Sequence, residues 1–165
     1  MENIQPDHCA SSGPTDEEVQ AFQTATRDLI GVALRSLEVL AGEVSLPQFR
    51  LLLALGDLGR VPSSQVAQAL GLGASSVTRL ADRLHASGHI VRGGEAHHRS
   101  VVTLELTERG RRLVEDVLSW RRRELSRLLS TLSPEQRAAT AEGLTALHRA
   151  IDCADELVQH GPVPL

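Results

Sequence analysis

The fold of this 165-residue chain is decided by residues 62–88, PSSQVAQALGLGASSVTRLADRLHASG. Apolar residues recur at helical spacing on both sides of a three-residue turn, GLG at 71–73. The first segment begins at a Pro-Ser pair and the second ends before Gly88, which are ordinary start and stop signals of helices. Two short helices joined by so tight a glycine-bearing turn predict a helix-turn-helix.

The second of these helices, about residues 74–87, has two contrasting faces. One face is apolar and the other carries small hydroxyls near its start, with arginines one and two turns on; the polar members are Ser75, Thr78, Arg79, Asp82 and Arg83. Amides and hydroxyls at a helix N-terminus can meet phosphates, and Arg79 can bind a guanine edge bidentately. We therefore predict that this helix enters a DNA major groove; a solvated polar face is the alternative.

Residues 89–106 predict a β-hairpin. Val102, Leu104 and Leu106 alternate with polar residues, which is the period of a half-buried strand. Arg92 and Arg99 flank the glycines of the tip, and such a cationic loop suits contact with the DNA backbone or the minor groove. The alternative is a loop with surface arginines.

Long apolar stripes lie on both sides of this central region, and we predict that they mediate homodimerisation. Their members are Val19, Phe22 and Leu29 in a first helix and Leu147, Ile151 and Val158 in the last. The alternative is an intrachain core, but the small central lobe offers too little surface to cover them. The expected organisation is a disordered tail (1–13), an N-terminal dimerisation helix (14–44), a DNA-binding lobe (45–108) and C-terminal dimerisation helices (107–160).

The charge distribution agrees with this organisation. The chain has a net charge of −4, and all 17 of its basic residues are Arg. Residues 60–112 hold eight Arg and four acids, a net of +4, so the remainder carries −8. No apolar run approaches the roughly 20 residues of a membrane span, and no signal peptide is evident, so we expect a cytoplasmic protein without a membrane partner.

Four segments occur in the order expected of the MarR family of transcriptional regulators, which the chain resembles over about residues 16–158. They are LPQFRLLLALGDLG (46–59), SSQVAQALGLGASSVTRLADRLHASGHIVR (63–92), RSVVTLELTERGRRL (99–113) and LSPEQR (132–137). The resemblance implies a homodimer with interlocked outer helices, two winged helix-turn-helix lobes on a pseudo-palindromic operator, and often a small effector. Ser75, Ser76, Thr78, Arg79 and Arg83 match the family's recognition helix, and Arg99 matches its wing arginine.

One departure from the family lies in the wing. The family usually has Asp, any residue, Arg at its tip, and here His97 stands at the Asp position. That Asp helps to position the wing arginine through a charge-assisted hydrogen bond. A neutral His can accept one hydrogen bond, whereas a protonated His repels Arg99. We therefore predict that DNA affinity depends on pH.

The sequence also contains residues typical of two other kinds of chemistry. His97 and His98, with His85, His89 and Glu95, suggest a metal site or a catalytic pair, but adjacent residues in a hairpin rarely converge on one ion and no nucleophile accompanies them. By resemblance, Cys9 suggests peroxide sensing, which depends on tyrosines that this chain lacks. We predict no metal, no cofactor and no enzymatic activity.

The fold expected is mainly α with a small β-hairpin wing: a winged helix-turn-helix with long terminal dimerisation helices. The function expected is that of a homodimeric, sequence-specific DNA-binding repressor. A winged-helix module that binds protein partners without DNA, or a His-dependent metal sensor or enzyme, is the alternative. The RRR run at 121–123 is expected to lie on a solvated helix face.

Overall fold

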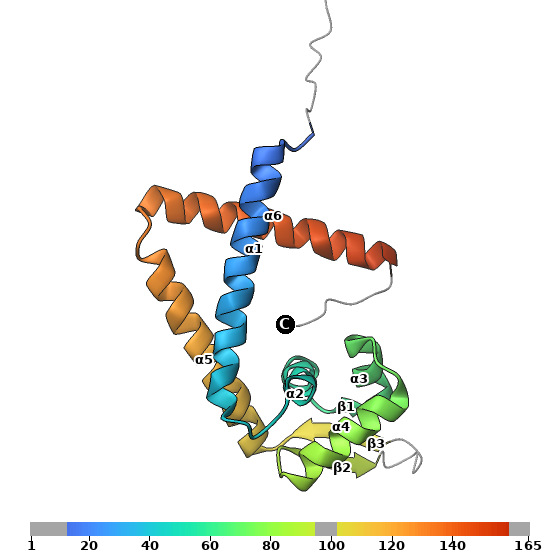
Figure 1. Cartoon of the computed structure of the whole chain (residues 1–165). Coiled ribbons are helices and arrows are strands. Elements are labelled where there is room, and N and C mark those ends of the chain that lie inside the picture. The colour runs from blue at the N-terminus through green and yellow to red at the C-terminus, as the bar shows by residue number, and fades with distance from the viewer. Residues whose placement is uncertain (1–12, 95–101, 159–165) are drawn as a thin grey trace, which may run out of the picture.

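The computed structural model describes residues 13–94 and 102–158 and confirms the predicted fold class (Figure 1). Its elements are α1 (Asp16–Ser36), η1 (Leu37–Leu40), α2 (Leu46–Leu58), β1 (Val61–Pro62), α3 (Ser63–Leu70), α4 (Ala74–Ala86), β2 (Ile90–Gly94), β3 (Val102–Leu106), α5 (Glu108–Leu129) and α6 (Pro134–Val158). Within these two ranges, no helix combines the length and apolar character that a membrane crossing requires.

Capping residues begin the helices where the sequence predicts. The Thr15 hydroxyl accepts from the Glu18 amide while the Glu18 carboxylate accepts from Thr15, which closes a capping box at α1. At its other end α1 stops at Ser36, and a 3-10 turn continues the chain to Leu40. The Ser36 hydroxyl donates to the Ala33 carbonyl at 2.6 Å, so a side chain takes up one of the last carbonyls of α1.

The central lobe packs α2, α3 and α4 against one face of a three-stranded antiparallel sheet, with strand order β1-β3-β2. Its core contains the fully buried Phe49, Val66, Val77, Leu84 and Leu104. The hairpin register pairs Ile90 with Leu106 and Gly94 with Val102, so the predicted wing is present. The two-residue strand β1 was not predicted, because two residues are too few to show a strand period.

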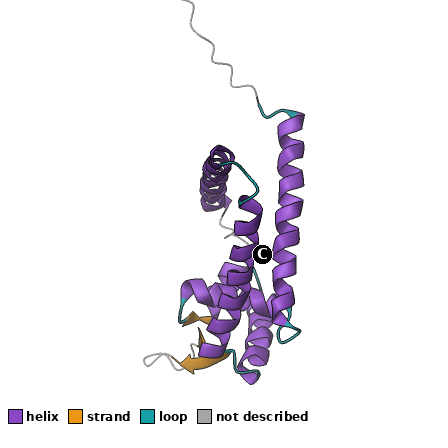
Figure 2. Cartoon of the chain, turned by 90° about the vertical axis from the view of Figure 1, so that its left-hand side faces the viewer, coloured by secondary structure: helices purple, strands orange, loops and turns teal. Residues whose placement is uncertain are grey.

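The three longest helices, α1, α5 and α6, form an open helical frame beside the lobe (Figures 1 and 2). Helix α5 packs on α1, η1 and α2 and so connects the frame to the lobe. In Figure 1 helix α6 passes behind α1, whereas Figure 2 shows the two helices apart, and every residue from Pro134 to Ile151 is exposed. A 25-residue helix with so little burial lacks the tertiary packing that stabilises most helices in water.

Candidate nucleic-acid interface

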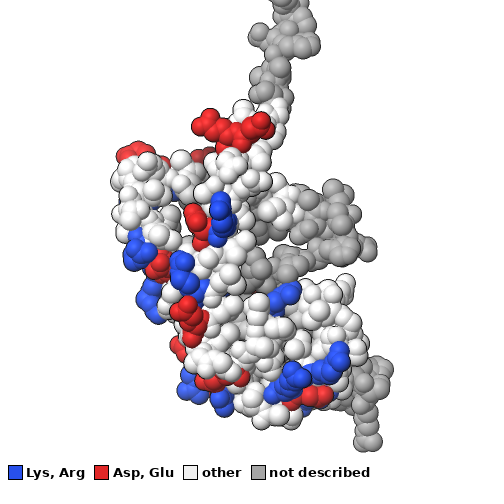
Figure 3. All heavy atoms as spheres, viewed as in Figure 1, with Lys and Arg blue, Asp and Glu red and all other residues white. Residues whose placement is uncertain are grey.

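Helix α4 presents its polar face to solvent, as the sequence predicts. Val77, Ala81 and Leu84 are buried in the lobe. The residues proposed to bind DNA lie on the other side: Ser75, Thr78, Arg79 and Arg83 are exposed, and Ser76 is half-buried. Figure 3 shows basic side chains, with an acidic one among them, gathered at the lower right over this lobe. The arrangement offers a convex, cationic helix of the size that a major groove admits.

Hydrogen bonds within α4 orient two of these side chains. The Thr78 hydroxyl donates to the Ala74 carbonyl at 2.9 Å, so its methyl group and its remaining oxygen lone pairs are presented outward. The Arg79 guanidinium lies 3.5 Å from the Ser76 hydroxyl oxygen, which favours one direction for a long side chain. Gly73 occupies the N-cap without a side-chain cap bond, and the start of the helix therefore stays open to an anion.

Arg92 is bound within the protein. Its Nη1 donates to the Asp82 carboxylate, so strand β2 of the wing is clipped to α4. The Arg92 side chain keeps 30% of its surface exposed. The sequence predicts that Arg92 contacts DNA and does not reveal its partner Asp82, which lies ten residues earlier on another element.

Arg60 braces the wing at the end of β2 nearest its tip and was not predicted. Its Nη2 donates to the Gly94 carbonyl at 3.4 Å, from the face of the sheet opposite the core. A Cβ at Gly93 would lie 2.9 Å from that same nitrogen and 3.0 Å from the Thr103 hydroxyl oxygen. Gly93 is therefore needed for Arg60 to lie flat across the strands, a long-range relation that no local pattern in the sequence reveals.

The tip of the wing lies outside the described residues. Glu95, His97, His98 and Arg99 all fall there, so their predicted roles stay predictions. Among the residues that are described, no three His, Cys, Asp or Glu side chains are grouped so as to hold a metal ion. Cys9 and the side chain of Cys153 also lie outside that part.

The apolar stripes of the terminal helices are exposed on the single chain. Phe22 is 55% exposed and Leu147 is 40% exposed, and Val19, Leu29 and Ile151 lie between these values. A groove of about 510 Å³ separates α1 from α6 and is lined by Ala21, Phe22, Ala25, Leu29, Leu144 and Leu147, among others. The side chain of Val158 is not among those described.

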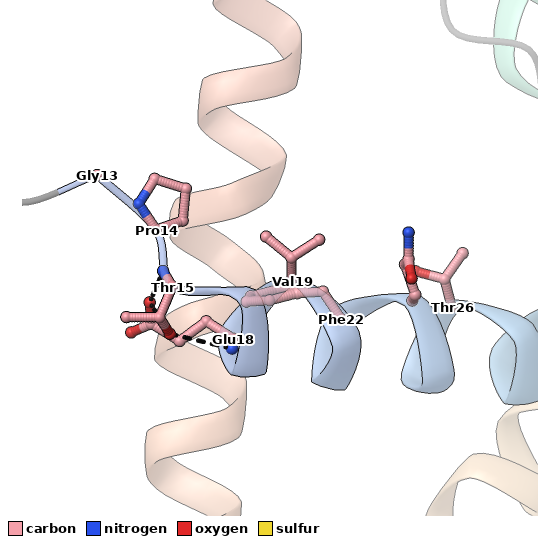
Figure 4. Close-up of a pocket in the computed structure, with 8 residues that line it drawn as sticks. Gly13, Pro14, Thr15, Glu18, Val19, Phe22 and Thr26 are labelled. Atoms are coloured by element: carbon pink, nitrogen blue, oxygen red, sulfur yellow. Dashed lines mark hydrogen bonds between the residues drawn. The ribbon is translucent and has the colours of Figure 1, made fainter.

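A second hollow of about 760 Å³ lies at the start of α1, beside Val19 and Phe22. Figure 4 shows these two side chains along α1, with the bonded Thr15 and Glu18 at its first turn. So much exposed apolar surface on one helix is typical of a protein–protein interface.

The expectation for the RRR run was wrong for its first member. Arg122 and Arg123 are exposed, as predicted. Arg121 is half-buried and donates to the Ser36 hydroxyl oxygen on α1, and Glu124 pairs with Arg127. Burial lowers the pKa of the Arg121 guanidinium. The period of α5 turns Arg121 toward α1, a relation set by packing of the two helices.

Comparison with known proteins points to one family. The MarR family model matches residues 43–100. The chain is 34% identical over 112 residues to the uncharacterized HTH-type transcriptional regulator YfiV of Bacillus subtilis, covering 68% of this chain and 70% of YfiV. It is 31% identical over 105 residues to the HTH-type transcriptional repressor MdtR of the same organism, covering 64% of this chain and 68% of MdtR. The crystal structure of RV1404 from Mycobacterium tuberculosis superposes with a TM-score of 0.78 at 30% identity, covering 86% of this chain and 97% of RV1404.

Proposed function

Because the chain belongs to the MarR family of helix-turn-helix transcriptional regulators, we propose that it binds a pseudo-palindromic DNA operator as a homodimer and represses transcription. The observation that carries this proposal is the exposed, cationic face of α4, with Arg79 and Arg83 outward and Val77 and Leu84 buried beneath. The similarity to MdtR, a named repressor, supports the direction of regulation. Nothing in the proposal requires a catalytic group, a metal or another cofactor.

Recognition is proposed to divide between base contacts and phosphate contacts. Arg79, steadied by Ser76, reads a guanine edge in the major groove, because its planar fork matches the two acceptors of guanine. Ser75, Thr78 and Arg83 contact phosphates or neighbouring bases and set the register. Arg99, at the tip of the wing, contacts the backbone or the minor groove.

Dimerisation is proposed to bury the exposed stripes of α1 and α6. Fully burying a Val, Leu, Ile or Phe side chain contributes about 1.5–3 kcal/mol, and the five exposed members of these stripes are all of these four kinds. A two-fold dimer places the same stripe on both partners, so each residue is used twice. The two α4 helices then face half-sites about 34 Å apart on one side of the duplex.

Regulation by a small effector is the last part of the proposal. A ligand bound between a lobe and the helical frame would change the separation of the two α4 helices. Because both half-sites need the same separation, such a change weakens binding at both of them.

The DNA-binding proposal is tested by selecting duplexes from a random-sequence library and titrating them against salt. We expect Arg79→Ala to cost about 1–3 kcal/mol on the selected site and to relax the preference at one base pair. Arg137→Ala, an exposed arginine at the start of α6, is the matched control and should leave both unchanged. A purified protein that binds no duplex at low salt would refute the proposal in favour of a protein-interaction module.

The dimer is tested by sedimentation equilibrium. We expect Leu147→Glu on α6 to dissociate the dimer, because it places a charge in the groove between α1 and α6 that the proposed dimer buries. Leu58→Glu, an exposed leucine at the end of α2, is the control and should sediment like the unmodified protein. A single mass for all three proteins would contradict the proposed interface.

A further inference from the structure

His89 is fully buried where the recognition helix, the wing and α5 meet. Its amide donates to the Leu84 carbonyl at 2.9 Å, and its carbonyl accepts from the Thr107 amide at 3.0 Å. A Cβ at Gly110 would lie 2.2 Å from that same carbonyl oxygen. The first turn of α5 therefore rests directly on the backbone of His89, and a change at this residue reaches both the lobe and the frame.

The imidazole of His89 faces a shared carboxylate. Its Nε2 lies 3.5 Å from Oε2 of Glu43, in the loop between η1 and α2, and within residues 13–94 and 102–158 it has no hydrogen-bond partner. The same Oε2 accepts from Arg109 Nη2, on α5, at 2.8 Å. Glu43 and Arg109 are the charged groups that act on His89; the ring of His85 on α4 is bonded to the Ile90 carbonyl. Glu43 thus stands between two competing donors.

The neutral imidazole allows only two of the three side-chain hydrogen bonds that link Leu84, Ser87, the ring and Glu43, although the Leu84 carbonyl always keeps the His89 amide as a donor. The Ser87 hydroxyl lies 2.8 Å from His89 Nδ1 and 3.2 Å from the Leu84 carbonyl, and it has one proton to donate. If that proton goes to Leu84, Nδ1 must carry the ring proton, and Nε2 then turns a lone pair toward the Glu43 carboxylate. If it goes to Nδ1, the Leu84 carbonyl loses this donor. Only the imidazolium completes all three bonds.

We propose that His89 and Glu43 are positioning residues for DNA binding, and that protonation of His89 draws Glu43 from Arg109 to the imidazolium, loosening α5 from the lobe. The inference rests on the proposed function, because its output is the separation of the two α4 helices. The chemistry needs only a proton, and the partner exchange alters no covalent bond.

The direction of the effect follows from the surroundings. Burial, and then the positive charge of Arg109, lower the pKa of His89, while Glu43 raises it. The fold therefore favours the neutral ring, and this stabilisation is complete above the ordinary His pKa of about 6.5. This stabilisation is lost as the pH falls from about 6.5 toward the lower pKa that His89 has in the folded protein. Acidification thus weakens the junction, and with it the binding of two half-sites at a fixed separation.

The network is tested by following the His89 ring through a pH titration by NMR, with its signal assigned from its loss in His89→Gln. We expect Glu43→Gln to lower the His89 pKa and Arg109→Gln to raise it. Glu38→Gln on η1 and Arg112→Gln on α5 are matched controls, each an exposed neighbour of the same charge, and should leave it unchanged. Shifts of one sign in both variants, or none, would overturn the proposed exchange.

The link to DNA is tested by measuring affinity at pH 7.5 and 5.5 for the unmodified protein and His89→Gln. We expect the unmodified protein to lose at least about threefold more affinity on acidification, which corresponds to half a pKa unit between free and bound states. Histidines of the wing contribute equally to both proteins and cancel. Equal losses would overturn this inference alone, whereas no binding by the unmodified protein at pH 7.5 would overturn the proposed function. If His89→Gln does not fold, Glu43→Gln and Arg109→Gln must move the pH midpoint of binding in opposite directions.

Discussion

Arg121 on α5 donates to the Ser36 hydroxyl oxygen on α1 through both Nε, at 3.3 Å, and Nη2, at 3.0 Å. The two residues are 85 positions apart in the chain, and Ser36 is fully buried. This bond joins α1 and α5, two helices of the frame, at the residue where α1 ends and η1 begins to lead the chain toward the lobe.

Ser36→Ala is expected to lower the free energy of unfolding by about 1–2 kcal/mol, because a hydrogen bond from a half-buried guanidinium loses its acceptor. Urea denaturation at one fixed protein concentration measures the loss, since the proposed dimer would make stability depend on concentration. Thr24→Ala, which removes an exposed hydroxyl bonded within α1, is the control. A similar loss in both variants would show that the Arg121 bond contributes nothing of its own.

Gly110→Ala is expected to destabilise the protein by about 3 kcal/mol or more, because its Cβ would meet the His89 carbonyl oxygen at 2.2 Å and neither backbone can move freely. Gly31→Ala on α1 is the matched helical control: its Cβ would meet the flexible Arg35 guanidinium at 3.5 Å, an ordinary contact. We expect it to stabilise by about 0.5–1 kcal/mol, the helix preference of Ala over Gly. Thermal denaturation of both variants should give shifts of opposite sign.

Asp82→Asn is expected to raise affinity for duplexes of any sequence, because it removes an acid from the DNA-facing surface and frees Arg92. The slope of log K against log[salt] should steepen by about one, the contribution of one further phosphate contact. Asp116→Asn, an exposed acid on α5, should change neither quantity. A fall in affinity for every duplex would instead show that the Arg92 pair acts mainly by holding the wing.

His97→Asp is expected to flatten part of the dependence of DNA affinity on pH between about 5.5 and 7.5, where an ordinary His titrates. The physical reason is that protonated His97 repels Arg99, whereas an Asp in its place attracts it. Identical pH profiles for the unmodified protein and the variant would make His97 a bystander. Combining His97→Asp with His89→Gln then separates the wing from the buried junction.

Local sequence patterns predict the features that depend only on interactions between residues close in the chain. The capping box at Thr15 and Glu18 and the left-handed Gly71 that ends α3 depend on residues within one helical turn, and both are present. The faces of α4 followed from its period, because burial of Val77 and Leu84 requires only that one side of the helix meets the lobe. Strand β1 was not predicted, since two residues are too few to show a repeating pattern.

The amino-acid sequence by itself determined the fold class, the position of α4 and its exposed cationic face, because spacing and capping specify helices and their polar sides. Only the tertiary structure decided which partners the charged residues take. Asp82 with Arg92, Arg60 with Gly94, Ser36 with Arg121, and His89 with Glu43 are all joined by packing of separate elements. The free energy of such a contact depends on distance and burial, and neither can be read from separation along the chain.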